Sequence, residues 1–436
     1  MEIIDGVVLE EYSPENVISL CEHSYLSDED AAYFIKQEVD FCETAYEGIP
    51  KYLGICSEES RLRASYYIGA EWIDSSHAVV VTPKCTNVDY VEMFATALKH
   101  SESSSYFSKF YGMDFSGEKI ATNAHLSMLT PMLVIHYLSL IKKLLKVGLR
   151  RDYILREENL HSKIKGKIVI TRNIKLNNIS KRGDRTYCSY QEYTVDTTDN
   201  RILKKALHFS KTLICALKDH KLYPSLMKEL NSAFAEFESV GDDVEVREIK
   251  RCAGGKVYSS YADALKVAQM ILKRCNYSLS DVGNTNDETV PFWIDMARLY
   301  EVYVYSKLVE AYGSDNIKFQ VEGYRKTAVD FIKLDEQVII DTKYKPHYLI
   351  GNRGIVDDVR QISAYARDEK ILSNFGEYND IAPCLIIYPD VTIEPDEEGD
   401  QCNKVVKFSE DSILTQSSPI RGFRKFYKLS IPLPQL

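Results

Sequence analysis

The chain has 436 residues, of which 45% are hydrophobic and 27% are charged, and this composition is typical of a globular protein with two or three domains. Its net charge of −10 argues against a protein whose whole surface binds polyanions such as nucleic acid. A local basic groove is compatible with this charge. The ten cysteines form no C-x-x-C pair, which argues against a zinc site or a disulfide framework and indicates reduced thiols. The acidic N-terminus has neither the basic nor the apolar region of a secretory signal, so a cytoplasmic location is expected.

The first 120 residues are predicted to form a β-rich N-terminal domain. The segments "ASYYIGAEWI" (64–73) and "HAVVVTPK" (77–84) are rich in β-branched and aromatic residues, and the short "DSS" between them predicts a hairpin. A Ser-rich stretch and a Gly-containing stretch follow, and they place a domain boundary near Ala121.

Residues 121–288 are predicted to form a mainly helical middle domain. Charged residues interrupt the most apolar window, 131–149, so it predicts an amphipathic core helix and not the ~20 consecutive apolar residues that a membrane span needs. One interruption with strand-like alternation is expected over "GKIVITRNIKLNN" and "RTYCSYQEYTVDT". Helices resume at "DNRILKKALHF", for which Asp199 or Asn200 is the expected cap.

Residues 289–436 are predicted to form a compact C-terminal α/β domain. The expected order is a helix over 292–313, two strands, a helix over 358–372 and a strand over 383–390. Mixed strands and helices of this kind make the predicted fold class multidomain α/β.

The two strands of this domain carry charges where a buried sheet would hold apolar residues. In "VDFIKLDEQVIIDTKYK" (329–345), a turn of two or four residues places Asp330 directly opposite Asp341, whereas a turn of three or five residues shifts the pairing. Asp-Glu is not a favoured two-residue turn, so a four-residue turn over 334–337 is expected. Residues that face each other across two strands have Cβ atoms about 4.5–5.5 Å apart, which would bring both carboxylates to one site.

The residue types in this hairpin predict metal-dependent chemistry. Side chains alternate along a strand, so Lys343 shares the face of Asp341 and Thr342 points away. Two aspartates supply hard oxygen ligands for Mg²⁺ or Mn²⁺, which polarise a phosphoryl oxygen and lower the pKa of a bound water. Lys343 would orient that water or stabilise charge on the phosphate. The alternative is a hairpin whose charges meet solvent, with Asp341 and Lys343 as a weak surface pair.

The helix that follows carries a polar and an aromatic residue on one face. Gln361 and Tyr365 are four residues apart, a spacing that would let both reach the backbone or a base beside the metal. Without the evidence of the hairpin, an ordinary amphipathic helix would explain this spacing equally well.

The spacing D-x10-D-T-K followed by Q-x3-Y resembles the PD-(D/E)xK nuclease superfamily. More specifically, the chain resembles the McrC family, the nuclease subunits of McrBC-type restriction systems that act on DNA with modified cytosine. The resemblance includes, in order, "YYIGAEWIDSSHAVVVTPK", "KGKIVITRNI", "YQEYTVDTTDNRILKKAL" and "FWIDMARLYEVYV". Each match is modest, and their order makes the combination specific.

The resemblance implies a role for each matching residue. Asp330, Asp341 and Lys343 match the catalytic triplet, with the two aspartates as the metal ligands, and Gln361 and Tyr365 match the auxiliary helix motif.

Three positions qualify this match. Asp341 stands where much of the superfamily has Glu, and Val329 replaces the proline before the first aspartate, which weakens the motif. Glu301, on the preceding helix, matches an acidic position of related nucleases and is a candidate third ligand, although a solvated helix face explains it equally well.

The resemblance also implies partners for this chain. A PD-(D/E)xK nuclease domain over 289–436 would cut double-stranded, modified DNA, and an McrB-like AAA+ GTPase hexamer would engage the N-terminal domain; nuclease domains would also be able to pair in the assembly. The segment Gly254–Lys256 lacks the G-x-x-x-x-G-K-[ST] phosphate loop, so this chain is expected to bind no nucleotide itself.

Two other functions compete with a partner-dependent nuclease. The chain would be an adaptor if its main work were to dock in an AAA+ ring and stimulate it, or a stand-alone nuclease if it cut without a motor. The basic segments "KRGDR" (181–185) and "RGFRKFYK" (421–428) are candidates for contact with phosphates and bases, and a solvated loop or strand edge is the favoured interpretation of both.

Overall fold

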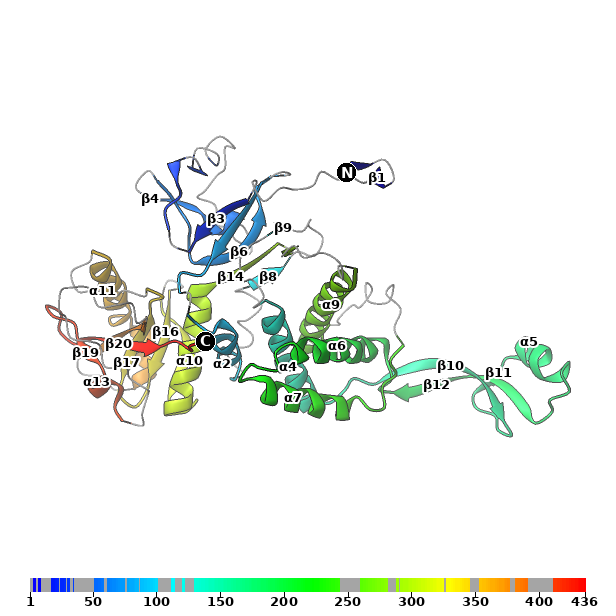
Figure 1. The fold of residues 1–436 in the computed structure, drawn as a ribbon. Helices are drawn as coiled ribbons and strands as arrows, with labels where there is room; N and C mark the ends of the chain where they lie inside the picture. Colours follow the sequence, from blue (N-terminus) through cyan, green and yellow to red (C-terminus); the bar gives the residue numbers. More distant parts are fainter. Residues whose placement is uncertain are drawn as a thin grey trace. The chain divides into compact units, whose positions relative to one another are not determined.

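The computed structural model shows two compact units (Figure 1). Unit 1 consists of residues 1–128 and 284–436, and unit 2 consists of residues 129–283. The structure describes residues 3–4, 7–8, 17–22, 24–28, 30–31, 34, 51–58, 61–74, 77–85, 87–100, 111–113, 120–121, 129–243, 259–280, 288–289, 291–324, 327–345, 353–376, 381–390 and 411–436. The division into domains 1–120, 121–288 and 289–436 stays a prediction, whereas the mixed α/β class is confirmed.

A five-stranded sheet in unit 1 contains strands from distant parts of the chain. In sheet order they are β3 (Val17–Cys21), β7 (Ala78–Thr82), β6 (Tyr67–Trp72), β14 (Phe292–Asp295) and β8 (Tyr111–Met113). β6 and β7 form the predicted antiparallel hairpin, in which Trp72 lies opposite Ala78. β3 lies parallel to β7.

Strand β14 corrects the prediction of a single helix over 292–313. Its residues pair with β6 on one side and with β8 on the other. The Asp295 side chain then accepts a hydrogen bond from the backbone N–H of Arg298 and caps α10 (Met296–Tyr312). The strand partners are more than 150 residues away in sequence, so helical periodicity alone could not reveal where the strand ends and the helix begins.

The second large sheet of unit 1 has six strands. In sheet order they are β15 (Ile317–Glu322), β16 (Ala328–Lys333), β17 (Val338–Thr342), β18 (Cys384–Asp390), β20 (Phe426–Pro432) and β19 (Ser418–Pro419). β15, β16 and β17 are antiparallel neighbours, whereas β17, β18 and β20 run parallel. The helix α11 (Arg353–Tyr365) lies in the connection between β17 and β18, as a parallel pair requires.

Helices α10 and α11 cover opposite faces of this sheet. Ile332 belongs to an apolar cluster with Val359 and Ile362 of α11. Its neighbour Phe331 points to the other face, where its ring stacks on Tyr305 of α10 with centroids 5.9 Å apart. The sheet is therefore covered by a helix on each face.

Shorter elements complete the described part of unit 1. They are β1 (Ile3–Ile4), β2 (Val7–Val8), η2 (Lys51–Gly54), β4 (Cys56–Glu58), β5 (Arg61–Arg63), α2 (Tyr90–Ala97), β9 (Ile120–Ala121), β13 (Glu288–Thr289), α12 (Glu369–Leu372), η7 (Ser373–Phe375) and α13 (Ile413–Gln416).

Unit 2 combines a helical bundle with an extended arm (Figure 1). The helices are α4 (Leu129–Val147), α6 (Thr198–Cys215), α7 (Tyr223–Glu236) and α9 (Ser259–Ser280). α4 is the predicted amphipathic core helix, and no helix among the described residues is long and apolar enough to cross a membrane. α6 is capped by the Thr197 side chain, which accepts a hydrogen bond from Asn200 N–H, and this corrects the predicted cap at Asp199 or Asn200.

The arm consists of two long antiparallel strands and a small helical tip. The strands are β10 (Asp152–His161) and β12 (Arg185–Thr194), joined by β11 (Lys167–Ile168), α5 (Ile170–Asn173) and a π-helical turn (Ile174–Asn178). The sequence analysis missed β10. It also predicted strand alternation over "ITRNIKLNN", which is helical. There the buried Asn177 exchanges amide hydrogen bonds of 3.0 and 2.8 Å with Asn159 of β10, a contact between segments that local patterning does not encode.

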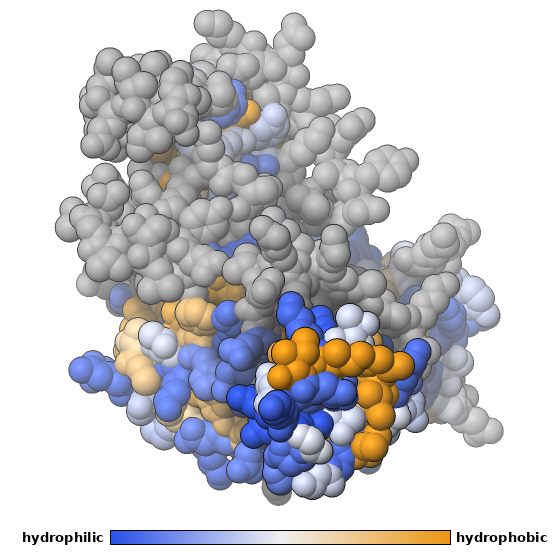
Figure 2. All heavy atoms as spheres, turned by 90° about the vertical axis from the view of Figure 1, so that its right-hand side faces the viewer, coloured by the Kyte–Doolittle hydropathy of each residue, from blue (hydrophilic) through white to orange (hydrophobic). Residues whose placement is uncertain are grey.

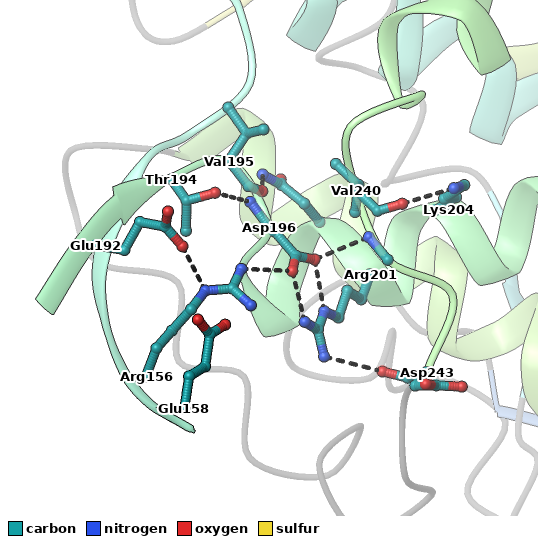
Figure 3. A network of polar contacts seen from close by, with 12 residues as sticks. Arg156, Glu158, Glu192, Thr194, Val195, Asp196, Arg201, Lys204, Val240 and Asp243 are labelled. Carbon is teal, nitrogen blue, oxygen red and sulfur yellow. Dashed lines mark hydrogen bonds and ion pairs between the residues drawn. The ribbon is translucent and has the colours of Figure 1, made fainter. Parts of the chain in front are cut away.

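A buried aspartate fixes the base of the arm to the bundle (Figure 3). Asp196 follows β12 and accepts hydrogen bonds from Arg201 of α6 at 2.6 and 2.7 Å and from Arg156 of β10 at 3.1 Å. The backbone N–H of Gly241 is a further donor at 2.8 Å. The Arg201 hydrogen bonds are the largest cause of a lowered pKa for Asp196, so the folded protein favours its ionised form.

Replacing Asp196 with alanine is expected to lower the free energy of unfolding of unit 2 by about 2–4 kcal/mol, because two arginines lose a charged acceptor. The Asp196 pKa is lower in the folded than in the unfolded state. Its contribution is therefore present above the unfolded pKa of about 3.9 and is lost as the pH falls below that value. Urea unfolding followed by far-ultraviolet circular dichroism at pH 7 and pH 3 measures both effects. Asp219→Ala, at an exposed turn after α6, is the matched control and should change stability by less than about 0.5 kcal/mol.

The tip of the arm exposes apolar side chains among basic ones, and Figure 2 shows this end of the molecule with apolar atoms surrounded by hydrophilic ones. The exposed apolar residues are Ile164, Ile168, Ile170, Ile174, Leu176 and Ile179. The basic residues of this segment are Lys163, Lys165, Lys167, Arg172, Lys175, Lys181, Arg182 and Arg185. Apolar exposure rimmed by charge is typical of a surface that binds another molecule.

Candidate functional site

The β16–β17 hairpin has the predicted turn and register. The turn spans the four residues 334–337, and Phe331 lies opposite Ile340. Asp330 and Asp341 are the next two residues in the same register, at the point where the ladder of paired residues ends. The charged ends of the two strands therefore share one end of the sheet.

Asp330 is half-buried, and Thr342 holds its carboxylate. The strand alternation had predicted that Thr342 would point away from this site. Asp330 Oδ2 accepts hydrogen bonds from the backbone N–H of Thr342 at 2.7 Å and from the Thr342 hydroxyl at 2.6 Å. Because the ladder ends at Phe331 and Ile340, the backbone N–H of Thr342 bonds to the Asp330 carboxylate and not to the opposite strand. The threonine thereby fixes the orientation of the first carboxylate.

Asp341, Lys343, Gln361 and Tyr365 form a continuous chain of polar contacts. The carboxylate of Asp341, a residue only 3% exposed, lies with Oδ2 2.6 Å from Lys343 Nζ. Lys343 Nζ donates to Gln361 Oε1 at 3.0 Å, and Gln361 Nε2 donates to the Tyr365 hydroxyl at 3.3 Å. The structure thus brings together the predicted residues of the hairpin and of the helix.

Burial makes the ionisation of both carboxylates costly. Burial, followed by the charge of Asp330, raises the pKa of Asp341 to about 7. Burial also raises the pKa of Asp330. Burial alone would lower the pKa of Lys343, but the charges of Asp341 and Asp330 outweigh it and leave that pKa raised. A bound cation would therefore favour the ionised form of both carboxylates.

Glu301 lies on α10 and is buried near the same end of the sheet. Its carboxylate accepts a hydrogen bond from the side-chain amide of Gln320, in β15. Burial, followed by the charge of Asp330, raises the pKa of Glu301 well above its usual range. Gln320 has a φ of +51°, a left-handed conformation that non-glycine residues rarely adopt inside a strand, and the ladder with β16 is interrupted at this residue, opposite Asp330.

Comparisons with known proteins identify the family. The family model described as "McrBC 5-methylcytosine restriction system component" matches residues 62–389, well over half of the chain. The chain belongs to this family. No curated protein matches this McrBC component.

Two solved structures are similar to the McrBC component at low identity. One is a half-complex refined from a tetradecameric assembly of Thermococcus gammatolerans McrB AAA+ hexamers with bound McrC; it is 14% identical, has a TM-score of 0.39, and the match covers 96% of this chain and 95% of that one. The other is the McrBC complex of the same organism, which is 14% identical with a TM-score of 0.31 and covers 67% and 87% of the two chains.

The donor set of the McrBC component fits Mg²⁺ through two carboxylates. Among the described residues, no three His, Cys, Asp or Glu side chains are placed to hold a metal ion by themselves. Magnesium commonly takes only one or two carboxylates and completes its shell with water and substrate phosphates, which Asp330 and Asp341 would allow. The buried Asp341 Oδ2 supports this fit, because it receives no hydrogen bond of normal geometry although the Lys343 ammonium lies beside it.

The second basic segment, 421–428, begins in a turn at the far end of the sheet that carries this site. Phe426 is level with Cys384 in the parallel sheet, and Cys384 is level with Ile339, two residues before Asp341. The turn at 421–425 precedes β20 and therefore lies toward the opposite end of the sheet from the carboxylates. The segment 181–185 belongs to the arm of unit 2. Lys428, at the end of the second segment, is level with Ile386 of β18, which is level with Asp341. Contact of either segment with nucleic acid stays a prediction.

Besides the Thr342 hydrogen bonds to Asp330, two further contacts of the site were not predicted from the sequence. Lys345 Nζ contacts the Asp358 carboxylate of α11 at 2.8 and 3.0 Å and so ties the end of the hairpin to the helix that carries Gln361. The second is the hydrogen bond that the side-chain amide of Gln320 donates to the Glu301 carboxylate. The five-residue stretch after Asp341 contains two lysines, which was a usable signal for the first contact, whereas nothing in the strand pattern marks Gln320.

Proposed function

We propose that this McrBC component is the nuclease subunit of its restriction system, a Mg²⁺-dependent endodeoxyribonuclease that cuts modified double-stranded DNA together with an AAA+ GTPase. The observation that carries the proposal is the convergence of Asp330, Asp341 and Lys343 at one end of a buried sheet, with Gln361 beside the ammonium. A hairpin whose charges only met solvent would not bury Asp341 to 3% exposure.

The chemistry follows from the residues of the chain. Asp330 and Asp341 would hold Mg²⁺ or Mn²⁺, which supplies polarisation of a phosphoryl oxygen and acidification of a water. Thr342 keeps the Asp330 carboxylate in place, and Lys343 is positioned to orient the attacking water or to stabilise charge on the phosphate. Gln361 restrains the Lys343 ammonium, and Tyr365 restrains Gln361 in turn.

Two observations support an AAA+ partner: the family of the chain and the lack of a phosphate-binding loop in its sequence. The chain contains no G-x-x-x-x-G-K-[ST] loop, and the Gly254–Lys256 segment lies outside the described residues. A solved assembly similar to this chain holds McrC bound to McrB AAA+ hexamers. Nucleotide dependence would accordingly come from an McrB-like hexamer, with the N-terminal domain as the predicted docking part, and the nuclease domains of two copies would be able to pair on DNA.

Reconstitution with the cognate AAA+ GTPase tests this function. We expect a plasmid with 5-methylcytosine to be cut only when this chain, the partner, GTP and Mg²⁺ are all present, and we expect excess EDTA to abolish cutting and added Mg²⁺ to restore it. The unmethylated plasmid and the chain without partner are the controls. Stimulated GTP hydrolysis without any DNA cutting would identify an adaptor, and cutting without partner or GTP would identify a stand-alone nuclease.

A further inference from the structure

A lysine of the five-stranded sheet contacts the backbone of the candidate nuclease site. Lys84 lies two residues beyond β7, and its Nζ donates a hydrogen bond of 3.0 Å to the carbonyl oxygen of Tyr344. Tyr344 directly follows Lys343. A side chain from the N-terminal part of unit 1 is therefore bound to the segment that presents the ammonium to Asp341.

The Lys84 side chain is largely enclosed, with 13% of its surface exposed. Its ammonium lies 3.4 Å from the carboxylate of Glu22, whose side chain has no exposed surface. The same ammonium lies 4.0 Å from the ring centroid of Tyr344 and 4.9 Å from that of Tyr66. Burial raises the pKa of Glu22 to about 7 and lowers the pKa of Lys84. A flexible surface lysine would not be enclosed by a carboxylate and two aromatic rings.

The Tyr344 carbonyl is one of the backbone and side-chain contacts that hold the segment 343–345 after β17 ends. The backbone N–H of Lys343 donates to the Ile387 carbonyl at 2.8 Å, and the Lys345 side chain is paired with Asp358. The Lys84 ammonium binds the Tyr344 carbonyl between these two points. The Tyr344 ring is itself buried and packs against Tyr300 of α10, with centroids 5.6 Å apart.

We propose that Lys84 is a positioning residue of the nuclease site, which holds the backbone at Tyr344 so that the Lys343 ammonium stays at the Asp341 carboxylate. Lys84 does not touch the reacting atoms and acts through Tyr344 and Lys343. The inference rests on the proposed nuclease function. It makes the end of β7 a part of the site and assigns the buried Glu22 the role of counter-charge to Lys84.

The test compares variants of the full chain in the reconstituted assembly. The main variant is the double substitution Glu22→Gln/Lys84→Met, which removes the donor without leaving an unpaired buried carboxylate. Lys84→Arg keeps a cationic donor. The matched control is Lys99→Met, because Lys99 also pairs across elements of unit 1, with Glu310 of α10 at 2.6 Å, but not with the segment 343–345. For each variant kcat, KM for DNA, the half-saturating Mg²⁺ concentration, the thermal midpoint and the stimulation of partner GTP hydrolysis are measured.

We expect the double variant to lose about 10- to 100-fold in kcat or in Mg²⁺ affinity, as is usual when an outer support of a metal site is removed. Its thermal midpoint, its KM for DNA and its stimulation of the GTPase should stay near the wild-type values. Lys84→Arg should recover most of the loss, and Lys99→Met should cut DNA at the wild-type rate within about twofold.

Three outcomes would overturn the inference. Wild-type kcat and Mg²⁺ dependence in a folded double variant would show that Lys84 does not position the site, while the proposed nuclease function would stand. A loss of cutting that follows the loss of folded protein and disappears at low temperature would show a purely structural contact. Wild-type protein that stimulates the GTPase but never cuts DNA would end both the proposed function and this inference.

Discussion

Replacing Asp341 with alanine is expected to lower the rate of DNA cleavage by at least about 100-fold, which corresponds to about 2.7 kcal/mol of lost transition-state stabilisation. The substitution removes one of the two proposed magnesium ligands and the partner of the Lys343 ammonium, 2.6 Å away. Lys343 would remain near Gln361 but would no longer be held against the metal site. Single-turnover cleavage of methylated plasmid by the complete assembly measures the effect.

The control for this substitution is Asp357→Ala. Asp357 lies on α11 with 71% of its side chain exposed and pairs with Arg360 on the same helix, so its loss should leave the cleavage rate within about twofold. Stimulation of the partner GTPase should be normal in both variants, because the change is confined to the end of one sheet. Cleavage by Asp341→Ala at the wild-type rate would show that the metal site is wrongly assigned.

Replacing Phe331 with alanine is expected to lower the free energy of unfolding of unit 1 by about 3–5 kcal/mol, the usual cost of truncating a fully buried aromatic residue. Phe331 has no exposed surface, and its ring stacks between Tyr305 of α10 and Phe319 of β15, with centroid distances of 5.9 and 5.8 Å. The cavity would open directly beside Asp330, so a loss of cleavage should accompany the loss of stability.

The two tryptophans of the chain provide the measurement. Trp72 and Trp293 both lie in the five-stranded sheet, so their fluorescence during urea unfolding reports on unit 1. Phe423→Ala, at a turn residue that is 39% exposed, is the control and should cost less than about 1 kcal/mol. Equal unfolding midpoints for the two alanine variants would contradict the assignment of Phe331 to a packed core.

The local features of the candidate site followed from the sequence because they depend on neighbouring residues. The four-residue turn and the alternation of "VDFIKLDEQVIID" were sufficient to place Asp330 and Asp341 at adjacent strand ends. Turn length sets the register of a hairpin, and alternation sets the face of each side chain. The same argument failed for Thr342, because the ladder ends at Phe331 and Ile340 and the threonine hydroxyl donates a hydrogen bond to the Asp330 carboxylate.

In the fold as well, the features that depend on neighbouring residues were predictable, whereas pairings between distant segments were not. The hairpin of β6 and β7 and the core helix α4 were correctly predicted from short-range patterns. The strand β14 was hidden at the start of an apparent helix, because its partners β6 and β8 lie more than 150 residues earlier. The strand β10 was missed as well, since it is a half-exposed ribbon that pairs only with β12 among the larger strands.

The sequence by itself determined the pair of aspartates, the lysine beside them and the family to which they belong. Only the tertiary structure decided what holds them. Gln361 reaches Lys343 from a helix on one face of the sheet, Glu301 lies on a helix on the other, and Lys84 binds the Tyr344 carbonyl from a different sheet. These contacts join residues that are 18 to 260 positions apart, and their geometry depends on how the elements pack, which local periodicity does not carry.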